Sequence, residues 1–536
     1  MTKLFLTTAL AAFLAVPTLP ALAATPAPGE KLAAQQSYNY WLLDAIKTLD
    51  PQKNTDREGS DVINQLFEGL TSQDAKGAII PGLAESWTVS DDKKVYTFKL
   101  RDAKWSNGDP VTANDVVFAW RRLADPATAS EYAWFAELAN IANASEVVKG
   151  DQPADQLGVK AVDDRTLEVT LTQGTPYFLK MLTNASLFPV PQKVVEAEGD
   201  NWTQPGKLVG NGAFTLVSHD LGVQLTLKKS DTYWDAANTI LTDLKFTTVN
   251  DKNAALTRFQ AGELDYTEVP AGQYPRLKKE FPEAATISPK ACTYAYILNL
   301  SDKGPEALKD KRVRQALSLG MQRDIVVNNI LQGGQTPAWT WTHAAMDGFA
   351  EPENPWAAMS QEDCTAKAKE LLAEAGYGPD KPLALSLQYN TSEDHKKIAV
   401  AAQQFWKQIG VNVTLNNVEW KVHTDKMQNQ DFDTARYAWC AYYNEPSTFL
   451  DYFRSTGKNE GKFNNADYDA ALDHAKTAEN PAEDYKKAEA ILAEEVPAVF
   501  VYQYTSATLR NPAIKGVPLE NPMNDWYAKD FYRVEQ

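Results

Sequence analysis

The segment from Arg436 to Leu450 contains the residue types that most often build binding sites. Within fifteen residues it has a guanidinium, five large aromatic side chains, a cysteine and a residue suited to cap a helix. Arginine and aromatic residues dominate recognition surfaces, because they combine large contact areas with directional hydrogen-bond donors. A buried strand that runs into a turn would have a similar composition. The segment by itself leaves both interpretations open.

Patterns typical of catalytic and metal sites are missing from the sequence. The five histidines show no His-x-x-x-His spacing, and the three cysteines show no Cys-x-x-Cys pair. There is also no Gly-x-Ser-x-Gly motif, no phosphate-binding loop and no Gly-x-Gly-x-x-Gly after a strand. We therefore expect no metal site, no cofactor and no enzymatic activity. An exported hydrolase without such a motif stays an alternative.

The charge of the chain restricts its partners. Its formal net charge is −17, whereas nucleic acids and anionic lipid surfaces bind to basic patches. We therefore expect neither as a partner. The 14 tryptophans and 22 tyrosines are numerous for this length, and they indicate either a large aromatic core or a cleft that encloses a ligand.

The start of the chain has the pattern of a secretory signal peptide. Lys3 precedes an apolar stretch, and Ala21 and Ala23 are small residues at positions −3 and −1 of a cleavage site. The stretch is shorter than the roughly 20 apolar residues that span a bilayer. We predict that residues 1–23 are a signal peptide cleaved after Ala23, and that the chain is exported to the periplasm.

The three cysteines of an exported chain suggest one disulfide and one free thiol. Cys292 and Cys440 lie in strand-like runs, whereas Cys364 lies in a polar segment that starts a helix. The sequence permits three pairings. Since two cysteines on neighbouring strands can face each other, we predict the pair Cys292–Cys440.

Strand and helix patterns alternate in both halves of the chain. In the first half, an alternating strand, a helix capped by Thr112 and a second strand are predicted at 95–101, 113–122 and 165–171. In the second half, the order helix, strand, helix, strand is predicted at 364–376, 383–389, 395–410 and 411–415. This alternation indicates an α/β fold. A chain of 536 residues is too long for a single core, so two or three domains are expected.

Six sequence strings occur in order along the mature chain: Pro81–Trp87, Lys104–Asp115, Gly210–Leu216, Tyr233–Trp234, Arg312–Asp324 and Arg436–Leu450. Together they resemble the periplasmic oligopeptide-binding proteins, which are the soluble receptors of peptide ABC importers. The resemblance implies an α/β fold. It also implies the architecture of a two-lobed periplasmic binding protein with three domains. Domain I would combine residues 24–67, 192–291 and 508–536, domain II would be the insertion 68–191, and domain III would be 292–507.

The resemblance also implies a binding mode and a set of ligand-binding residues. Peptides of varied sequence share only their backbone, so a receptor for them has to read main-chain groups, as in strand addition. Main-chain groups of the segment Ala438 to Cys440 are the candidates for this pairing. The side chains at polar or aromatic pocket positions are Tyr132, Asn390, His395, Trp420, Arg436, Trp439 and Tyr504.

The sequence departs from the family at the positions that bind the ligand termini. The carboxylate that pairs with a free peptide amino terminus falls at Tyr442, and a second acidic position falls at Thr55, next to Asp56 and Arg57. We take Asp56 and Arg57 as candidate contacts. Either Asp56 replaces the missing carboxylate or the natural ligand lacks a free amine at this site, and we favour the second because Arg57 lies beside Asp56 and can neutralise it. Two basic positions at the carboxyl end become Leu331 and Met427, which leaves His395 and Arg436.

The main hypothesis is a monomeric periplasmic receptor that captures short peptides and delivers them to an inner-membrane ABC permease. A second hypothesis keeps this scaffold but changes the ligand to a modified, N-blocked or cell-wall-derived peptide or another small metabolite. A third, from a different class, is an exported enzyme or a holding chaperone.

Overall fold

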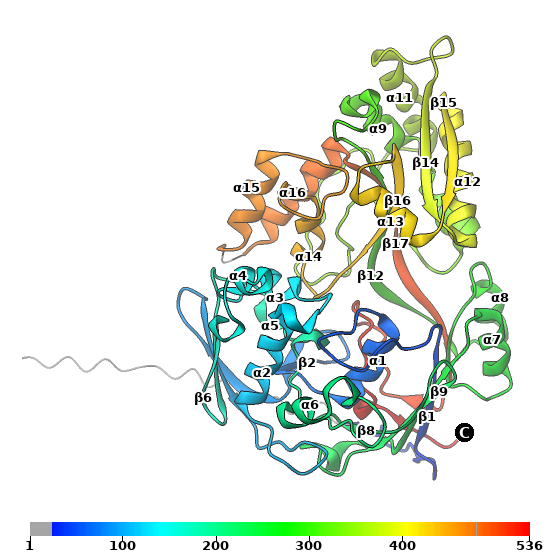
Figure 1. Ribbon diagram of the computed structural model, residues 1–536. Helices are drawn as coiled ribbons and strands as arrows, with labels where there is room; N and C mark the ends of the chain where they lie inside the picture. The colour runs from blue at the N-terminus through cyan, green and yellow to red at the C-terminus, as the bar shows by residue number, and fades with distance from the viewer. Residues whose placement is uncertain (1–23, 479) are drawn as a thin grey trace, which may run out of the picture.

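The computed structural model describes residues 24–478 and 480–536, so the predicted signal peptide lies outside the described part of the chain. The described residues form two lobes, which lie one above the other in Figure 1. Both lobes mix helices and strands, which confirms the predicted α/β class. Within these residues no helix is long and apolar enough to cross a membrane.

The lower lobe contains a four-stranded sheet assembled from distant parts of the chain. Its strand order is β1 (Ser37–Leu42), β10 (Asp243–Thr248), β9 (Gln224–Lys229) and β8 (Phe214–Asp220). The β1–β10 pair is parallel and the other pairs are antiparallel. The helix α1 (Arg57–Leu66) follows β1 and has contacts to β8. This arrangement brings the start of the mature chain beside segments that follow residue 200.

A second four-stranded sheet of the lower lobe comes from one continuous stretch of chain. Its antiparallel order is β4 (Ala84–Val89), β5 (Val95–Leu100), β7 (Thr166–Thr170) and β6 (Val159–Asp163). The strands predicted at 95–101 and 165–171 are therefore confirmed to within one residue at each end. Alternate residues of β5 are buried, as the period of a half-buried strand requires.

The helix predicted after Thr112 is α2 (Ala113–Ala124). The Asp115 carboxylate accepts a hydrogen bond from the Thr112 N–H (2.8 Å), so the first turn is closed by a side chain. Trp120 of this helix is fully buried in the core of the lower lobe.

A seven-stranded sheet is the framework of the upper lobe and extends through the connecting strands into the lower lobe. Its main path is β11 (Tyr266–Glu268), β17 (Ala498–Arg510), β12 (Ala285–Leu298), β16 (Thr434–Cys440), β14 (Leu383–Asn390) and β15 (Val411–Val418), and β13 (Thr336–Pro337) also pairs with β17. β14 and β15 confirm the predicted strands 383–389 and 411–415. The helix α12 (Glu393–Gln408) packs against both of them.

The helix predicted at 364–376 is α11 (Gln361–Glu374), which begins three residues earlier than expected. It does so because Ser360 caps it, with the Ser360 hydroxyl accepting a hydrogen bond from the Asp363 N–H (3.1 Å). Gly376 has φ +85°, which confirms the predicted left-handed glycine after the helix. The helix α12 likewise begins at Glu393, two residues before the predicted start.

The strands β12 and β17 connect the two lobes as a long antiparallel pair (Figure 1). Their register shifts between Pro289 and Thr293, and again between Tyr294 and Ala295. A proline has no N–H to donate to a strand ladder. The pairing between the lobes is therefore least regular near Pro289.

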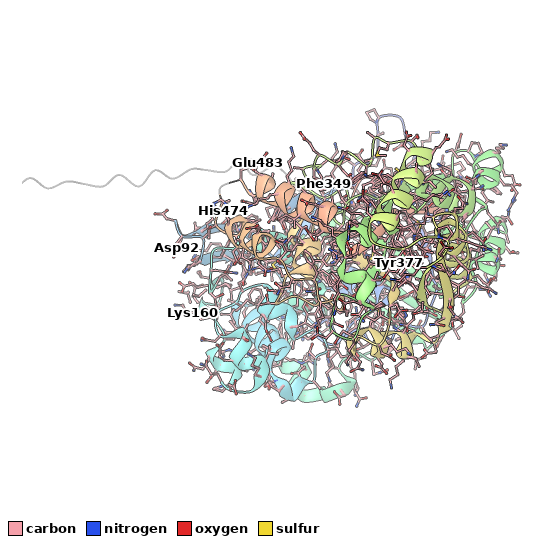
Figure 2. All side chains as sticks on the ribbon, turned by 90° about the horizontal axis from the view of Figure 1, so that it is seen from above. Asp92, Lys160, Phe349, Tyr377, His474 and Glu483 are labelled. Atoms are coloured by element: carbon pink, nitrogen blue, oxygen red, sulfur yellow. A yellow bond between two sulfur atoms is a disulfide. The ribbon has the colours of Figure 1, made fainter. Side chains whose placement is uncertain are left out.

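Many of the aromatic residues form the hydrophobic cores of the lobes. The largest fully buried side chains include Trp120, Trp202, Trp341 and Trp406, and they lie in separate clusters of the lower and upper lobes. Charged side chains such as those of Asp92, Lys160 and Glu483 lie at the periphery in Figure 2. The aromatic content therefore largely reflects the cores, and a smaller set remains for the cleft.

Candidate ligand-binding cleft

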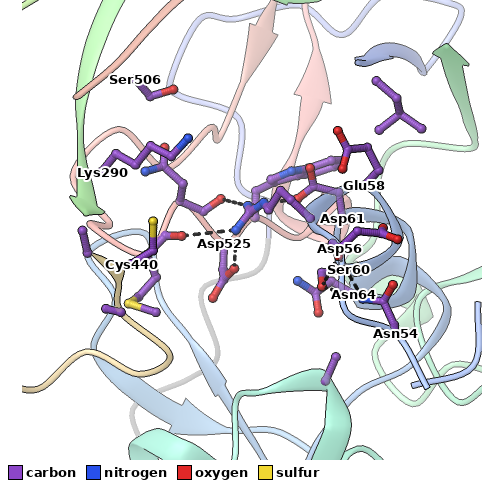
Figure 3. A pocket seen from close by; sticks show the side chains of 18 of the residues that line it. Asn54, Asp56, Glu58, Ser60, Asp61, Asn64, Lys290, Cys440, Ser506 and Asp525 are labelled. Carbon is purple, nitrogen blue, oxygen red and sulfur yellow. Dashed lines mark hydrogen bonds and ion pairs between the residues drawn. The ribbon is translucent and has the colours of Figure 1, made fainter. Parts of the chain in front are cut away.

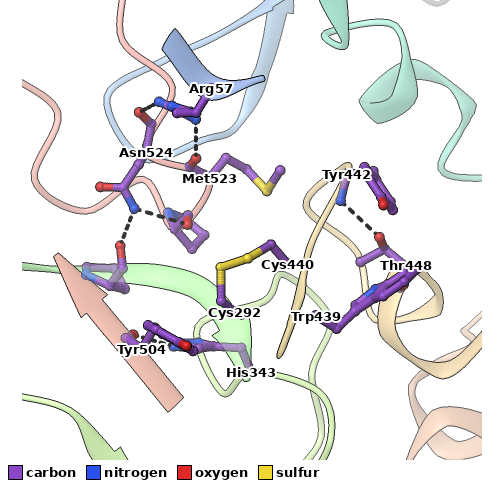
Figure 4. Close-up of a disulfide and its surroundings, with 12 residues drawn as sticks. Arg57, Cys292, His343, Trp439, Cys440, Tyr442, Thr448, Tyr504, Met523 and Asn524 are labelled. Carbon is purple, nitrogen blue, oxygen red and sulfur yellow. Dashed lines mark hydrogen bonds between the residues drawn. A yellow bond between two sulfur atoms is a disulfide. The ribbon is translucent and has the colours of Figure 1, made fainter. Parts of the chain in front are cut away.

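A disulfide joins two neighbouring strands where the upper lobe faces the lower one. Cys292 of β12 and Cys440 of β16 are opposite residues of the antiparallel pair, and their Cα atoms are 4.0 Å apart (Figure 4). The predicted pairing is confirmed. Cys364 is the free cysteine and is buried in the first turns of α11. The disulfide therefore ties β16 to the connecting strand β12 beside the cleft.

The edge of β16 that faces away from β12 is open near the disulfide. β14 pairs only with Thr434 and Ala435 of β16. The Arg436 carbonyl faces away from β12, since it accepts a hydrogen bond from His423 Nε2 (2.9 Å). Backbone groups alternate sides along a strand, so the N–H and C=O groups of Ala438 and Cys440 face this open edge. The Ala441 N–H agrees with this alternation, because it points to β12 and donates to the Ala291 carbonyl (2.8 Å).

A cavity of about 640 Å³ lies between the lobes next to the disulfide. Cys292, Cys440 and Tyr442 line it from the upper lobe, and Arg57 and Tyr132 line it from the lower lobe. Figure 3 shows that charged side chains surround this space from both sides. Of the residues predicted to contact a ligand, five therefore lie around one cavity: Asp56, Arg57, Tyr132, Cys440 and Tyr442.

The side chains of Asp56 and Arg57 have different roles at the start of α1. The Asp56 carboxylate accepts a hydrogen bond from the Gly59 N–H (2.6 Å) and so caps the helix. Arg57 forms ion pairs with Asp61 (2.9 Å) and Asp525 (3.2 Å). Arg57 therefore does not neutralise Asp56, contrary to the expectation from the sequence. Its side chain instead reaches the C-terminal segment, where it also donates to the carbonyls of Met523 and Asn524 (Figure 4).

Tyr442 lies in an aromatic cluster where the two lobes meet. Its ring centroid is 5.1 Å from that of Trp134, 5.4 Å from that of Trp439 and 6.2 Å from that of Tyr132. The Tyr442 N–H donates to the Thr448 hydroxyl (3.0 Å). Burial raises the pKa of Tyr442 to about 12, so its hydroxyl is uncharged near neutral pH. This side chain can donate or accept a hydrogen bond but cannot neutralise an ammonium group.

Trp439 lines a second cavity, of about 560 Å³, together with Trp134 and Tyr442. The indole N–H of Trp439 donates to the Thr448 carbonyl (2.6 Å), which fixes the orientation of the ring. Tyr442 therefore borders both cavities, and its aromatic neighbours form the wall between them.

Arg436 is buried, and among residues 24–478 and 480–536 no carboxylate forms an ion pair with it. Its guanidinium donates to Asn390 Oδ1 (3.4 Å) and to the Tyr504 hydroxyl (3.2 Å), and it lies 5.0 Å from the ring centre of Tyr294. Arg436 is only 9% exposed, and its Nε has no hydrogen-bond partner in residues 24–478 and 480–536. A buried cation with neutral partners is costly unless an anion accompanies it. The arrangement is suited to hold a carboxylate.

His395 and Trp420 lie around this arginine rather than around the 640 Å³ cavity. The His395 ring is 5.6 Å from that of Tyr294, and burial, followed by the charge of Arg436, lowers the pKa of His395 to about 3. His395 is therefore neutral at physiological pH. Trp420 is 53% exposed and stacks on His423, whose Nε2 donates to the Arg436 carbonyl and whose Nδ1 faces the Gln388 amide (3.1 Å). Leu331 and Met427 are packed in the cores of the upper lobe.

Several charged residues of the 640 Å³ cavity were not predicted from the sequence: Glu58, Asp61, Lys252, Glu268, Lys290, Arg510 and Asp525. They come from α1, β11, β12, β17, the helix α7 (Lys252–Gln260) and the C-terminal segment. The charged run from Asp56 to Asp61 at a helix start was the one local signal for some of them. In the described part of the chain, no group of three or more His, Cys, Asp or Glu side chains is arranged to hold a metal ion.

Comparisons with known proteins agree with this architecture. The chain matches the family described as bacterial extracellular solute-binding proteins, family 5 Middle, over residues 78–461. It is 43% identical over 515 residues to the periplasmic murein peptide-binding protein MppA of Escherichia coli (strain K12), covering 95% of each chain. It is 41% identical over 523 residues to the periplasmic oligopeptide-binding protein OppA of the same organism, covering 96% of each.

Among solved structures, the unliganded open form of the murein tripeptide binding protein MppA is similar to the whole architecture. The TM-score is 0.83 at 42% sequence identity, and the match covers 95% of this chain and 99% of that one. This match spans most of the sequence, so it includes the two lobes, the connecting strands and the residues around the interlobe cavity. The chain belongs to the bacterial extracellular solute-binding proteins of family 5.

Proposed function

We propose that this protein is a periplasmic receptor that captures oligopeptides between its lobes and delivers them to an ABC importer. The observation that carries the proposal is the open edge of β16, where the main-chain groups of Ala438 and Cys440 face away from β12 beside the interlobe cavity. An extended peptide can pair with such an edge whatever its side chains are. The relatives named as oligopeptide- and murein peptide-binding proteins support the same ligand class.

The carboxyl end of the ligand is assigned to Arg436. Its guanidinium is buried among the neutral groups of Asn390, Tyr504 and Tyr294, so a ligand carboxylate would supply the missing negative charge. Arg436, Ala438 and Cys440 are alternate residues of β16. Alternate residues of a strand face the same side, so the Arg436 side chain lies in line with the two backbone contacts.

The amino end is assigned to the region of Tyr442. The side chain there is an uncharged phenol among aromatic rings, so a free ammonium group gains no ion pair from it. The proposed ligand class is still peptides. The receptor would differ from relatives with a carboxylate at this position in how it recognises the amino terminus of the peptide.

The connecting strands support a hinge between the lobes. The proposed boundaries of domain III, at 291/292 and 507/508, both fall inside β12 and β17, and the first lies within the stretch where their register shifts. Domains I and II would be residues 24–67 with 192–291 and 508–536, and residues 68–191. Closure around this connection would bury the ligand and present a distinct surface to the permease.

Export follows from the signal-peptide pattern, with cleavage proposed after Ala23 and the mature receptor acting as a monomer in the periplasm. Edman degradation or intact mass of the exported protein tests the cleavage site, and light scattering tests the monomer.

The ligand class is tested by native mass spectrometry of protein purified from the periplasm without denaturation. A mixture of short peptides released on unfolding is the expected result. A single non-peptide compound would overturn the peptide assignment, and turnover of that compound would overturn the receptor role.

A further inference from the structure

Besides the connecting strands, the two lobes share a buried contact that is formed by the loop after β16. Tyr443 follows β16 and so belongs to the upper lobe by its place in the chain, yet it is fully buried in the hydrophobic core of the lower lobe. Among the described residues, no other buried member of this core lies between Tyr266 and Ile514 in the sequence. One ring of the upper lobe therefore completes the core of the other lobe.

The ring of Tyr443 stacks on a ring of the lower lobe. Tyr177 directly precedes the helix α5 (Phe178–Met181) and is buried. The two ring centroids are 5.3 Å apart, and the ring planes are 4° from parallel. Separation of the lobes at this point would expose both rings to water, which is unfavourable because aromatic side chains bury large apolar areas. We therefore expect the contact to persist when the lobes move.

Hydrogen bonds within the loop hold Tyr443 in a fixed position on the upper lobe. Its hydroxyl is 2.9 Å from the Ser447 hydroxyl, and the Ser447 N–H donates to the Glu445 carboxylate (2.7 Å). The Tyr442 N–H donates to the Thr448 hydroxyl, so the residue before Tyr443 is held in the same way. The stack therefore joins an ordered part of the upper lobe to α5.

Polar contacts beside the stack connect the same parts of the two lobes. Lys180 of α5 forms an ion pair with Asp347 of the upper lobe (2.5 Å), and the Asn444 side chain accepts a hydrogen bond from the Asp347 N–H (3.0 Å). In Figure 1, α14 (Ser447–Leu450) lies above α3 (Trp134–Leu138) and α5, to the left of the connecting strands. The lobes are therefore held together at two separate places.

We propose that Tyr443 is a pivot between the lobes, and that the lobes rotate about a line through its contact with Tyr177 and through the connecting strands. The inference rests on the proposed hinge and names a residue that restricts its motion. Groups close to the axis of a rotation move least. Tyr442, next to the pivot, therefore keeps its ring contact with Trp134 in the open form, whereas Arg436 moves with the upper lobe. Tyr443 thus positions the wall at the proposed amino end of the ligand before the lobes close.

Distances between pairs of spin labels on ligand-free protein test the pivot. The pivot pair is Thr172→Cys with Ala345→Cys, two exposed sites that lie near the stack in the sequence of each lobe. The cleft pair is Thr55→Cys with Lys421→Cys, two exposed sites before α1 and on α13 (Trp420–Gln428). In Figure 1, α1 and α13 lie on opposite sides of the gap between the lobes.

Both pairs are placed in a Cys364→Ala background, which removes the free thiol and keeps the native disulfide. The protein is freed of ligand by unfolding and refolding with this disulfide intact. Pulsed dipolar spectroscopy should give one narrow distance distribution for the pivot pair. The distribution of the cleft pair should be at least about twice as wide, because the lobes of the ligand-free protein rotate.

Variants of the stack identify the residue that restricts the motion. Tyr443→Ala should widen the distribution of the pivot pair by about twofold or more, because the stacked ring is lost. Tyr443→Phe is the matched control, since it keeps the ring and should leave the distribution narrow. Tyr177→Leu is the second variant if Tyr443→Ala does not fold, because it keeps an apolar side chain in the core but removes the stack. Thermal unfolding verifies the fold of each variant.

The outcomes separate this inference from the proposed hinge. A pivot pair as broadly distributed as the cleft pair would overturn the pivot and leave the hinge in place. Narrow distributions at both pairs would show that the lobes do not rotate, and would overturn the hinge together with the pivot. A pivot pair that stays narrow in folded Tyr443→Ala and Tyr177→Leu would overturn the role of the stack.

Discussion

Cys292 and Cys440 face each other across β12 and β16, with their Cα atoms 4.0 Å apart, at the point where the upper lobe borders the cavity. The bridge closes a loop with a sequence separation of 148 residues. In the chain-entropy account, a loop of this size corresponds to a stabilisation of about 5 kcal/mol. The disulfide therefore holds the cavity-facing end of β16 in place on the connecting strand.

Thiol titration tests this pairing and the state of the third cysteine. The denatured, non-reduced protein should show one thiol, and peptide mapping should place it at Cys364. In the folded protein the same thiol should react slowly, because Cys364 is 2% exposed. Two or more free thiols in protein recovered from the periplasm would contradict the pairing.

Ligand-dependent closure is the second prediction. Peptide should raise the melting temperature, since it binds the folded state only, and should reduce the radius of gyration in small-angle scattering. The expected motion is a rotation of the lobes about β12 and β17. Tight binding with an unchanged scattering profile would argue against a hinge.

The third prediction concerns Tyr442. A buried ammonium needs a carboxylate, and breaking such a pair costs about 3 to 5 kcal/mol. Wild type should therefore bind free and N-acetylated forms of the same peptide with similar affinity in calorimetry. Tyr442→Asp should gain a preference for the free amine, because it introduces a carboxylate among the rings of Trp134 and Trp439.

A contrary result would assign the binding of the ligand ammonium group to a different residue. If wild type prefers the free amine by roughly 100-fold, the size expected of a buried ion pair, and Asp56→Asn abolishes this preference, then Asp56 has replaced the missing carboxylate. Its second oxygen is buried and has no hydrogen-bond partner among the described residues, so it retains the capacity to accept a hydrogen bond.

The fourth prediction concerns Arg436. Wild type should bind a peptide with a free carboxyl end about 10- to 100-fold more tightly than the same peptide with a C-terminal amide. Arg436→Met should remove this difference, and Arg436→Lys should retain part of it. Arg276→Gln, which changes an exposed arginine paired with Glu280, is the matched control. An unchanged preference in Arg436→Met, with the fold intact, would place the carboxyl end elsewhere.

The fifth prediction concerns Glu445, which is buried and accepts a hydrogen bond from the Ser447 N–H (2.7 Å). Burial raises the pKa of Glu445 from 4.5 to about 7. The folded state thus binds this proton more tightly than the unfolded state. The resulting stabilisation is complete below about pH 4.5 and is lost as the pH rises through about 7.

Glu445→Gln carries no charge and keeps a carbonyl oxygen for Ser447. Between about pH 5 and pH 8, the free energy of unfolding should fall less in this variant than in wild type, by about 2 to 3 kcal/mol. Urea unfolding at both pH values measures the difference, with the exposed Glu520→Gln as control. Parallel pH profiles of Glu445→Gln and wild type would refute the assignment.

Local patterns in the sequence determined most of the elements and one long-range bond. The strands 95–101 and 383–389 and the helix after Thr112 have periodicities that depend only on neighbouring residues, and the structure has them within a few residues. The helix start at 361 was missed because the Ser360 side chain caps the helix ahead of the predicted residues, and the start at 393 was missed because the first turn holds the acidic residues Glu393 and Asp394. The cysteine pairing was predictable because two of three cysteines had strand patterns.

The tertiary structure alone decided which groups line the interlobe cavity. Arg57 and Asp525 are separated by 468 residues, and nothing near either of them in the sequence indicates their ion pair. The open edge of Ala438 and Cys440 exists because β14 stops pairing at Ala435, which is a property of how three strands meet. Sequence periodicity reports which face of an element is buried, whereas the charge balance of a cavity depends on packing between distant elements.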